Sequence, residues 1–205
     1  MEIPMQIMLP ENLETLQLPA PESVLFYHNR DNRTFWIDYD IDVSVLDIAK
    51  WIIQINREDA DIPVEQRKPI RLLIFSYGGD GAACFSLLDT IAMSKTPVYT
   101  YNMGIAMSAG FLILLAGHKR FCTLRSTALA HSGSGGTSGS YESTEAQMKD
   151  YKHFVQAMRD YIIERTNIDT KLMNKKKSQE WYIYAEEQVQ LGICDKIINS
   201  IDDIL

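Results

Sequence analysis

The sequence is poor in the features that mark several protein classes. Its 205 residues include three cysteines, an odd number without a Cys-x-x-Cys pair, so neither a disulfide framework nor a zinc site is expected. The net charge of −7 leaves no basic surface for nucleic acid. No apolar run approaches the roughly 20 residues of a membrane span, and the first residues lack the basic and apolar pattern of a secretory signal. We therefore expect a cytoplasmic protein that binds neither membranes nor nucleic acid and holds no metal.

The composition that remains is that of a globular α/β protein. It is 46% hydrophobic and 23% charged. Residues 1–23 carry four prolines and predict an irregular arm, and residues 24–205 predict one domain in which β-prone runs alternate with helices. The expected strands cover residues 24–27, 34–37, 70–75, 97–101, 120–123, 127–130 and 194–198, and the expected helices cover 45–55, 82–93, 108–116, 143–166 and 184–190.

One serine lies among unusually small residues. The run from Gly104 to Gly110 reads Gly-Ile-Ala-Met-Ser-Ala-Gly, between a β-prone stretch and an apolar helix. A tight strand-to-helix turn would place the Ser108 hydroxyl at a helix N-terminus, where backbone N–H groups favour developing negative charge. The alternative is a serine that merely caps the helix.

Two other segments end strands of the same predicted sheet. The strand that ends near Phe75 is followed by Ser-Tyr-Gly-Gly-Asp-Gly, and the strand 127–130 is followed by His131 and a run of glycines and serines. Sites in α/β sheets collect at the carboxyl ends of strands. The sequence thus predicts that these segments and Ser108 form one site.

The helix over 143–166 has the strongest periodicity in the chain. Thr144 and Gln147 suggest a capping box at its start. One apolar stripe consists of Met148, Tyr151, Val155, Met158 and Ile162, and a second lies beside it at Phe154 and Tyr161. Two stripes exceed what packing on one sheet requires, so either the helix also contacts another subunit or its core-facing stripe is wide.

Taken in order, these motifs resemble the proteolytic subunit of the Clp protease (ClpP), a family of serine peptidases with the ClpP/crotonase fold. The family patterns Ser-Pro-Gly-Gly, Gly-x-Ala-x-Ser-x-Gly, His-x-Pro-x-Gly-Gly and Glu-Ala-x-x-x-Gly-(Leu/Ile)-Val-Asp correspond to residues 76–79, 104–110, 131–136 and 187–195. The resemblance extends over residues 24–199. It implies a fold of stacked βαβ units from which the helix over 143–166 protrudes.

The resemblance assigns catalytic roles residue by residue. Ser108 would attack the scissile carbonyl, and His131 would take the serine proton and pass it to the leaving amine. The backbone N–H groups of Gly79 and Ala109 would form the oxyanion hole. The residues that would pair with the substrate strand are Ser132, Gly133 and Ser134.

The sequence departs from the family at the third member of the catalytic triad. The aspartate is expected 19 residues before Asp195, where this chain has Lys176, and a lysine cannot accept the imidazole N–H. Three outcomes follow: Asn174 or another acceptor serves a slower enzyme, a carboxylate from elsewhere or from a neighbouring subunit substitutes, or the protein is an inactive or assembly-activated subunit.

The resemblance implies a serine endopeptidase that cuts peptides or unfolded proteins inside an oligomeric ring chamber and uses no cofactor. An AAA+ unfoldase would be a separate partner, because this chain has no phosphate-binding loop. The alternative is a catalytically inactive subunit that shapes or regulates an assembly. An acyl-CoA enzyme of the crotonase type would leave the pairing of Ser108 with His131 unexplained.

Overall fold

A mostly parallel sheet carries the fold. The structure is a computed structural model that describes residues 21–133, 135–176 and 178–205. The strands run in the spatial order β1-β2-β3-β4-β7, all parallel, while β5 pairs with β3 and β6 lies antiparallel to β5. Their bounds are β1 Thr34–Ile37, β2 Ile70–Ser76, β3 Val98–Met107, β4 Lys119–Thr123, β5 Thr127–Ala130, β6 Trp181–Tyr184 and β7 Lys196–Ile198. The mixed α/β architecture confirms the expected fold class.

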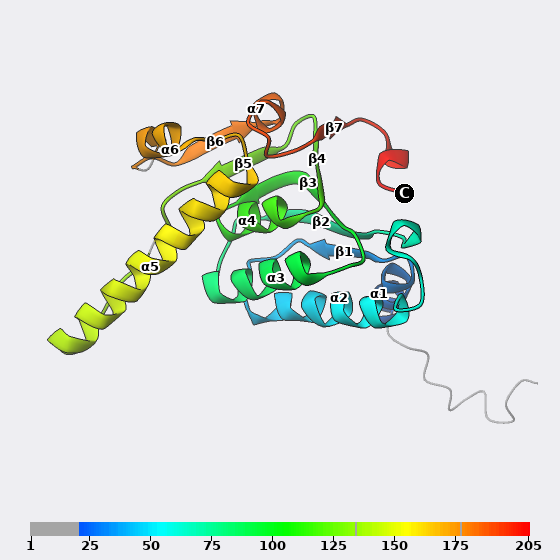
Figure 1. Cartoon of the computed structure of the whole chain (residues 1–205), viewed down its shortest axis with the longest axis horizontal. Coiled ribbons are helices and arrows are strands. Elements are labelled where there is room, and N and C mark those ends of the chain that lie inside the picture. Colours follow the sequence, from blue (N-terminus) through cyan, green and yellow to red (C-terminus); the bar gives the residue numbers. More distant parts are fainter. Residues whose placement is uncertain (1–20, 134, 177) are drawn as a thin grey trace, which may run out of the picture.

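Helices cover one face of the sheet much more fully than the other. Leu72 and Ile74 of β2 belong to the main core with α2, α3 and α4, whereas Leu73 points to the opposite face and packs with Tyr101 and Ile204 near the C-terminus. This alternation is the period of two expected for a strand. The helices are α1 Pro21–Asp31, α2 Leu46–Glu58, α3 Gly81–Met93, α4 Ala109–Ala116, α5 Tyr141–Arg165, α6 Thr170–Lys176 and α7 Ala185–Gln190 (Figure 1).

The strand β3 changes neighbours halfway along its length. Its first half pairs with β4, and its second half pairs with β5 in the register Ile105↔Thr127 to Met107↔Leu129. The ends of β3 and β5 therefore lie side by side. Because both strands run in the same direction, the residues that follow them emerge at one edge of the sheet.

The helix α5 projects from the body of the protein. Figure 1 shows its C-terminal end against the sheet domain and its N-terminal half extending away from it. Arg165 fixes the base, since its guanidinium donates to the carbonyls of Leu115 at 3.0 Å and Gly117 at 2.8 Å, at the C-terminal end of α4. A cation at a helix C-terminus is favourable both as a donor and through the helix dipole.

Three local expectations were wrong. Residues 24–27 lie in α1 rather than in a strand, because Arg30 holds this helix on α2 by pairing with Glu58 and by lying over the Trp51 ring, 5.3 Å from its centroid. The cap of α5 is Ser140, whose side chain accepts the Ser143 N–H, so the capping box at Thr144 does not form. The expected irregular arm over residues 1–23 does not extend to residue 23, because α1 already begins at Pro21, and residues 1–20 lie outside the described residues.

Two short elements were not predicted from the sequence. The helix α6 begins where Asp169 accepts the Leu172 N–H at 2.7 Å, and Lys175 and Lys176 lie in its last turn, where positive charge favours the helix end. The strand β6 alternates between buried and exposed residues, with Trp181 and Ile183 facing the core. Four residues are too few for this alternation to be recognised in the sequence.

A buried ion pair links the start of β1 to the end of α2. The Asp59 side chain is 1% exposed, and both of its oxygens accept Arg33 N–H groups at 2.7 Å. The Thr96 hydroxyl also donates to Asp59, at 2.8 Å. The hydrogen bonds from Arg33 lower the pKa of the Asp59 carboxyl.

We expect Asp59→Asn to lower the free energy of unfolding by about 3 kcal/mol at neutral pH, because Arg33 then lacks its charged partner. Since the folded-state pKa is lowered, the carboxylate stabilises the protein above its unfolded pKa of about 4, and this contribution is lost as the pH falls through the folded-state value. Urea unfolding of both proteins at about pH 7 and about pH 3 measures the difference. The control is Asp61→Asn, an exposed neighbour. Equal stability of the two variants at neutral pH would contradict the prediction.

Candidate active site

Ser108 and His131 meet where β3 and β5 end. The His131 Nε2 atom lies 2.7 Å from the Ser108 Oγ, and both side chains are partly exposed. The Ser108 N–H donates to the Leu129 carbonyl at 3.0 Å, so the strand pairing fixes the serine beside the histidine. A hydroxyl in contact with an imidazole is the arrangement required for a base-activated nucleophile.

The backbone at Ser108 is in a conformation that few non-glycine residues adopt. Its φ of 53° and ψ of −120° turn the chain sharply between β3 and α4, which begins at the next residue. The hydroxyl therefore lies at the N-terminus of a buried helix, as the small-residue motif predicted. A strained conformation at such a turn exposes the side chain of a nucleophile.

The glycine turn after β2 packs directly against the serine. Gly78 has a φ of 110°, and a Cβ atom there would lie 2.6 Å from the Ser108 Cβ and 2.9 Å from the Met107 carbonyl oxygen. Gly79 in turn contacts Ile41, and the Gly78 carbonyl accepts the Ile41 N–H at 2.7 Å. Side chains larger than hydrogen are thus excluded at both glycines.

Two backbone amides beside the serine make no hydrogen bond to a described residue, and they belong to Gly79 and Ala109. Ala109 is the first residue of α4, and Gly79 follows the glycine that contacts Ser108. Unpaired N–H groups next to a nucleophile are the donors that an oxyanion requires. Their position fits the role that the sequence predicts for them.

The loop that follows His131 is supported by α5. The Tyr151 hydroxyl donates to the Ser132 carbonyl at 3.4 Å. Its ring also lies against the glycines of the loop, since a Cβ at Gly135 would be 3.2 Å from it, and Gly133 has a φ of 81°. Ser132 and Gly133 therefore lie next to the histidine, whereas Ser134 lies outside the described residues.

Neither candidate for the third triad position contacts the histidine. Asn174 accepts a hydrogen bond from the Arg159 guanidinium at 2.6 Å, and the Lys176 ammonium lies over the Trp181 ring, 5.1 Å from its centroid. Among the residues that the structure describes, Ser108 is the hydrogen-bond partner of the His131 ring. Trp181 pairs with Ala130, so Lys176 still lies in the neighbourhood of His131.

A cavity of about 650 Å³ opens beside Ser108 and His131. The glycine turn forms one side of it and one face of α5 forms another. Phe154 of the second apolar stripe lines the cavity together with Tyr151 and Met158 of the first. The second stripe was expected to contact another subunit or to widen the core-facing stripe, and the structure adds a use that was not predicted, since Phe154 lines the cavity.

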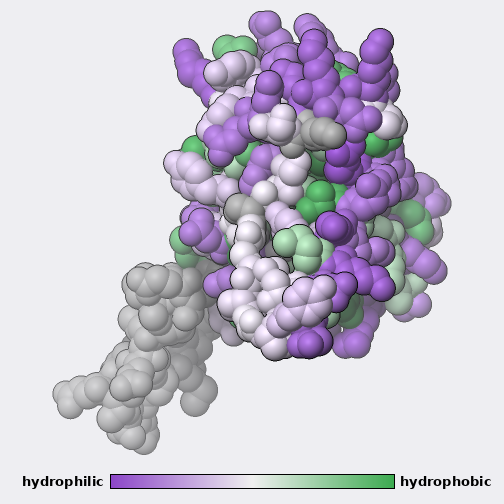
Figure 2. Space-filling view, turned by 90° about the vertical axis from the view of Figure 1, so that its left-hand side faces the viewer, coloured by the Kyte–Doolittle hydropathy of each residue, from purple (hydrophilic) through white to green (hydrophobic). Residues whose placement is uncertain are grey.

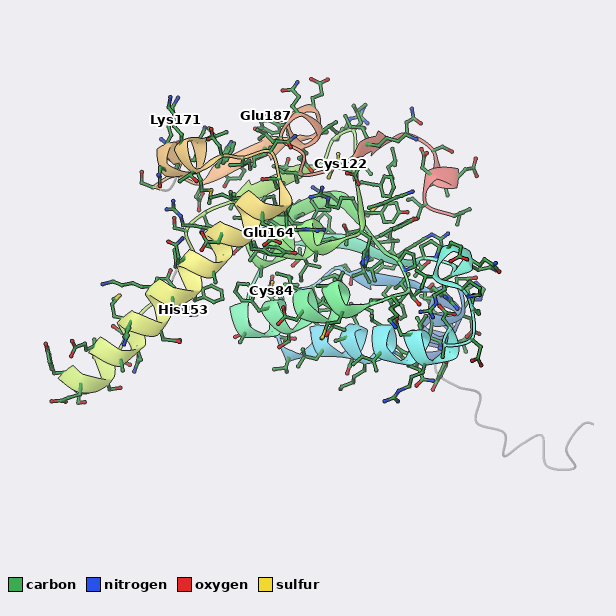
Figure 3. All side chains as sticks on the ribbon, viewed as in Figure 1. Cys84, Cys122, His153, Glu164, Lys171 and Glu187 are labelled. Atoms are coloured by element: carbon green, nitrogen blue, oxygen red, sulfur yellow. The ribbon has the colours of Figure 1, made fainter. Side chains whose placement is uncertain are left out.

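The remaining histidines and cysteines lie apart from this pair. His28, His118 and His153 are exposed, as expected, and Figure 3 shows His153 on the projecting helix. All three cysteines are buried and free. Cys84 lies beneath the site, where its thiol contacts the Ala109 carbonyl at 3.4 Å and burial raises its pKa to about 12. Such a thiol stays protonated and unreactive at neutral pH.

No cluster of three or more metal-ligating side chains occurs in the described part of the chain. Within the same residues, no helix has the length and apolar character needed to cross a membrane.

Comparison with known proteins identifies a family. The family model described as Clp protease matches residues 49–201, more than half of the chain. The chain is 35% identical over 139 residues to the ATP-dependent Clp protease proteolytic subunit 2 of Treponema denticola, covering 67% of this chain and 70% of that protein. It is 29% identical over 139 residues to the protein of the same name from Treponema pallidum, with the same coverage.

The close approach of Gly78 to Ser108 leaves no room for a side chain at this glycine. We expect Gly78→Ala to slow the modification of Ser108 by a fluorophosphonate about a hundredfold, because the added methyl group must displace the nucleophile by a large fraction of an ångström. The rate is measured by intact mass spectrometry, with circular dichroism to verify folding. Gly136→Ala is the matched control, since a Cβ there meets nothing within 4 Å. Equal rates in the two variants would refute this view of the turn.

Proposed function

This chain belongs to the Clp protease family, and from that premise we propose that it is a serine endopeptidase that cleaves peptides or unfolded proteins. The observation that carries the proposal is the 2.7 Å contact between the Ser108 Oγ and the His131 Nε2 beside two unpaired backbone amides. The cavity next to this pair is large enough for substrate side chains.

The chemistry follows from the positions of these groups. His131 takes the hydroxyl proton through Nε2 as the Ser108 oxygen attacks the carbonyl carbon of the substrate. The resulting oxyanion accepts hydrogen bonds from Gly79 and Ala109, and the dipole of α4 favours its negative charge. The imidazolium then donates its proton to the leaving amine, and a water molecule hydrolyses the acyl-enzyme by the same steps.

The enzyme we propose is a weak one in the resting state. The imidazolium that forms during the reaction lacks a carboxylate partner among the described residues, since Lys176 occupies the expected position and Asn174 is bonded to Arg159. An aspartate at this position stabilises the imidazolium and holds the histidine in the right tautomer. Activity is supported by the 2.7 Å contact between Ser108 and His131 and by the close approach of Gly78 to the serine.

We also propose that the protein works as a ring-shaped oligomer with a chamber, and that an AAA+ unfoldase supplies substrates. The support is family membership together with the projecting half of α5, where Tyr141 is 78% and Met148 42% exposed. A projecting helix with exposed apolar side chains is suited to contact another copy of the chain.

The second candidate is a subunit without catalytic activity, and the observation that favours it is the lysine at the triad position. Its role would be to shape or regulate an assembly. Labelling of the nucleophile separates the two candidates.

We expect a fluorophosphonate to add once to the full-length protein in its native assembly, on Ser108, because the hydroxyl contacts a base. Intact mass and peptide mapping locate the adduct. His131→Ala should reduce the labelling rate about a thousandfold or more, whereas His153→Ala, an exposed histidine on α5, should leave it unchanged. Absence of an adduct on Ser108 would favour the non-catalytic subunit.

A second prediction addresses the triad position. Lys176→Asp should raise kcat/KM for an unstructured peptide about tenfold or more, because it places a carboxylate near His131, where an aspartate typically contributes far more than this factor. The matched control is Lys175→Asp, which makes the same charge change at the adjacent, exposed position. If both variants cleave at equal rates, a missing carboxylate is not what limits the enzyme.

A further inference from the structure

One face of α5 forms a wall of the cavity next to Ser108 and His131. The α5 residues that line it lie on one broad face of the helix, and they are Gln147, Met148, Asp150, Tyr151, Phe154 and Met158. Figure 2 shows the side of the molecule from which α5 projects, with pale residues and some hydrophobic side chains at its centre and hydrophilic residues around them. This wall belongs to the substrate site, so its chemistry bears on which substrates fit.

The part of this wall nearest the base of α5 is apolar. Met158 is 4% exposed, and Leu112 of α4 lines the cavity beside it. Phe154 packs edge to face against Phe85, with ring centroids 5.1 Å apart, and it also lies against Gly81. The Phe154 ring is thus fixed by packing, and the surface that it presents to the cavity suits a chain of methylene groups.

The part nearer the tip of α5 carries a negative charge. Asp150 is the one carboxylate among the described residues that line the cavity, and neither lysine nor arginine lines it within that set. Asp150 is exposed, and no hydrogen bond or ion pair joins it to another described residue. Gln147, one turn before it, is bonded to the Ser138 carbonyl at 3.2 Å and to the Ser143 hydroxyl at 2.9 Å.

We propose that Asp150 makes this site selective for substrates that place a lysine or arginine side chain in the cavity, and against those that place a glutamate or aspartate there. This inference rests on the proposed function, since it assigns a preference to the same site. The apolar wall would hold the methylene stem, and the carboxylate would pair with the ammonium or guanidinium group. Because Asp150 is exposed, the pair is screened by water and salt, and we expect a lysine peptide to be preferred over its glutamate analogue about five- to tenfold.

The test uses three sets of fluorogenic peptides. Each set varies one of the three positions before the scissile bond. Within a set, the peptides differ only in carrying lysine, glutamine or glutamate at that position. We expect the full-length protein to give the highest kcat/KM with lysine and the lowest with glutamate at one position at least. Asp150→Asn should bring the ratio of lysine to glutamate close to one, and added salt should reduce it in the native protein.

The control variant separates a local effect from the general attraction of an acidic protein for cations. Asp160→Asn removes a carboxylate from the same helix at a position that does not line the cavity and that is bonded to Gln156 instead. It should keep the ratio of the native protein. If Asp150→Asn and Asp160→Asn change the ratio equally, or if Asp150→Asn leaves it unchanged, the inference is wrong.

A binding measurement makes the inference independent of catalysis. Ser108→Ala, which cannot form an acyl-enzyme, is titrated into fluorescently labelled lysine and glutamate peptides, and anisotropy gives the two dissociation constants. The inference is supported if the lysine peptide binds more tightly than the glutamate peptide and if Asp150→Asn, added to Ser108→Ala, abolishes this difference. This holds even if the native protein cleaves no peptide, because the absence of cleavage would count against the proposed function alone. Cleavage of glutamine peptides without any difference between lysine and glutamate overturns the inference and leaves the proposed function intact. Equal affinities of the two peptides, or no measurable binding of either, also overturn it.

Discussion

The contact between the Gly78 backbone and Ser108 is the constraint on which the site depends. It requires that β2 and β3 be neighbours in a parallel sheet, that β3 extend beyond the end of β2, and that the residue opposite the serine have no side chain. The register shifts between Ile74, which pairs with Asn102, and Ser76, which pairs with Ala106, so the end of β2 is still paired with β3 just before the contact. Gly79 follows Gly78 and lines the same cavity as Ser108, and the pairing of β3 with β5 brings His131 into contact with the hydroxyl. A single sheet edge thereby brings together Ser108 and His131, the nucleophile and the base that we propose.

The sequence predicted most of this arrangement because its signals are local and lie at strand ends. The small residues around Ser108, the glycines after β2 and the histidine after β5 each mark a turn, and parallel strands gather such turns at one edge. The position of α5 was predicted to within a few residues because its periodicity extends over several turns. Short elements such as β6 and α6 were missed, since four to seven residues give a pattern too brief to separate from a turn. The helix α1 was mistaken for a strand because its conformation depends on Arg30 and α2, which are distant in the sequence.

The third triad position shows a different limit of sequence reasoning. Counting along the motif places Lys176 where an aspartate is expected, and the structure adds what the lysine does instead, which is to lie over the Trp181 ring. A cation–π contact beside the base holds a positive charge near the place where catalysis must create another. The geometry of the serine and histidine does not depend on this residue, because strand pairing and the Gly78 contact already fix both. In the mechanism that we propose, the lack of a carboxylate would therefore destabilise the imidazolium formed during the reaction and would leave the contact between Ser108 and His131 in place.

The helix α5 extends from the candidate active site to the exposed surface of the protein. Its base is held by Arg165 on the end of α4, the same helix whose first residue follows the nucleophile. Its middle supports the loop after His131 through Tyr151 and lines the cavity through Phe154. Its tip is exposed and projects away from the body. A force on the tip, such as contact with another subunit, would therefore act on the two segments that carry the serine and the histidine. Since none of the described residues supplies a carboxylate to His131, contacts of α5 within the oligomer that we propose would help to decide how firmly this histidine is held.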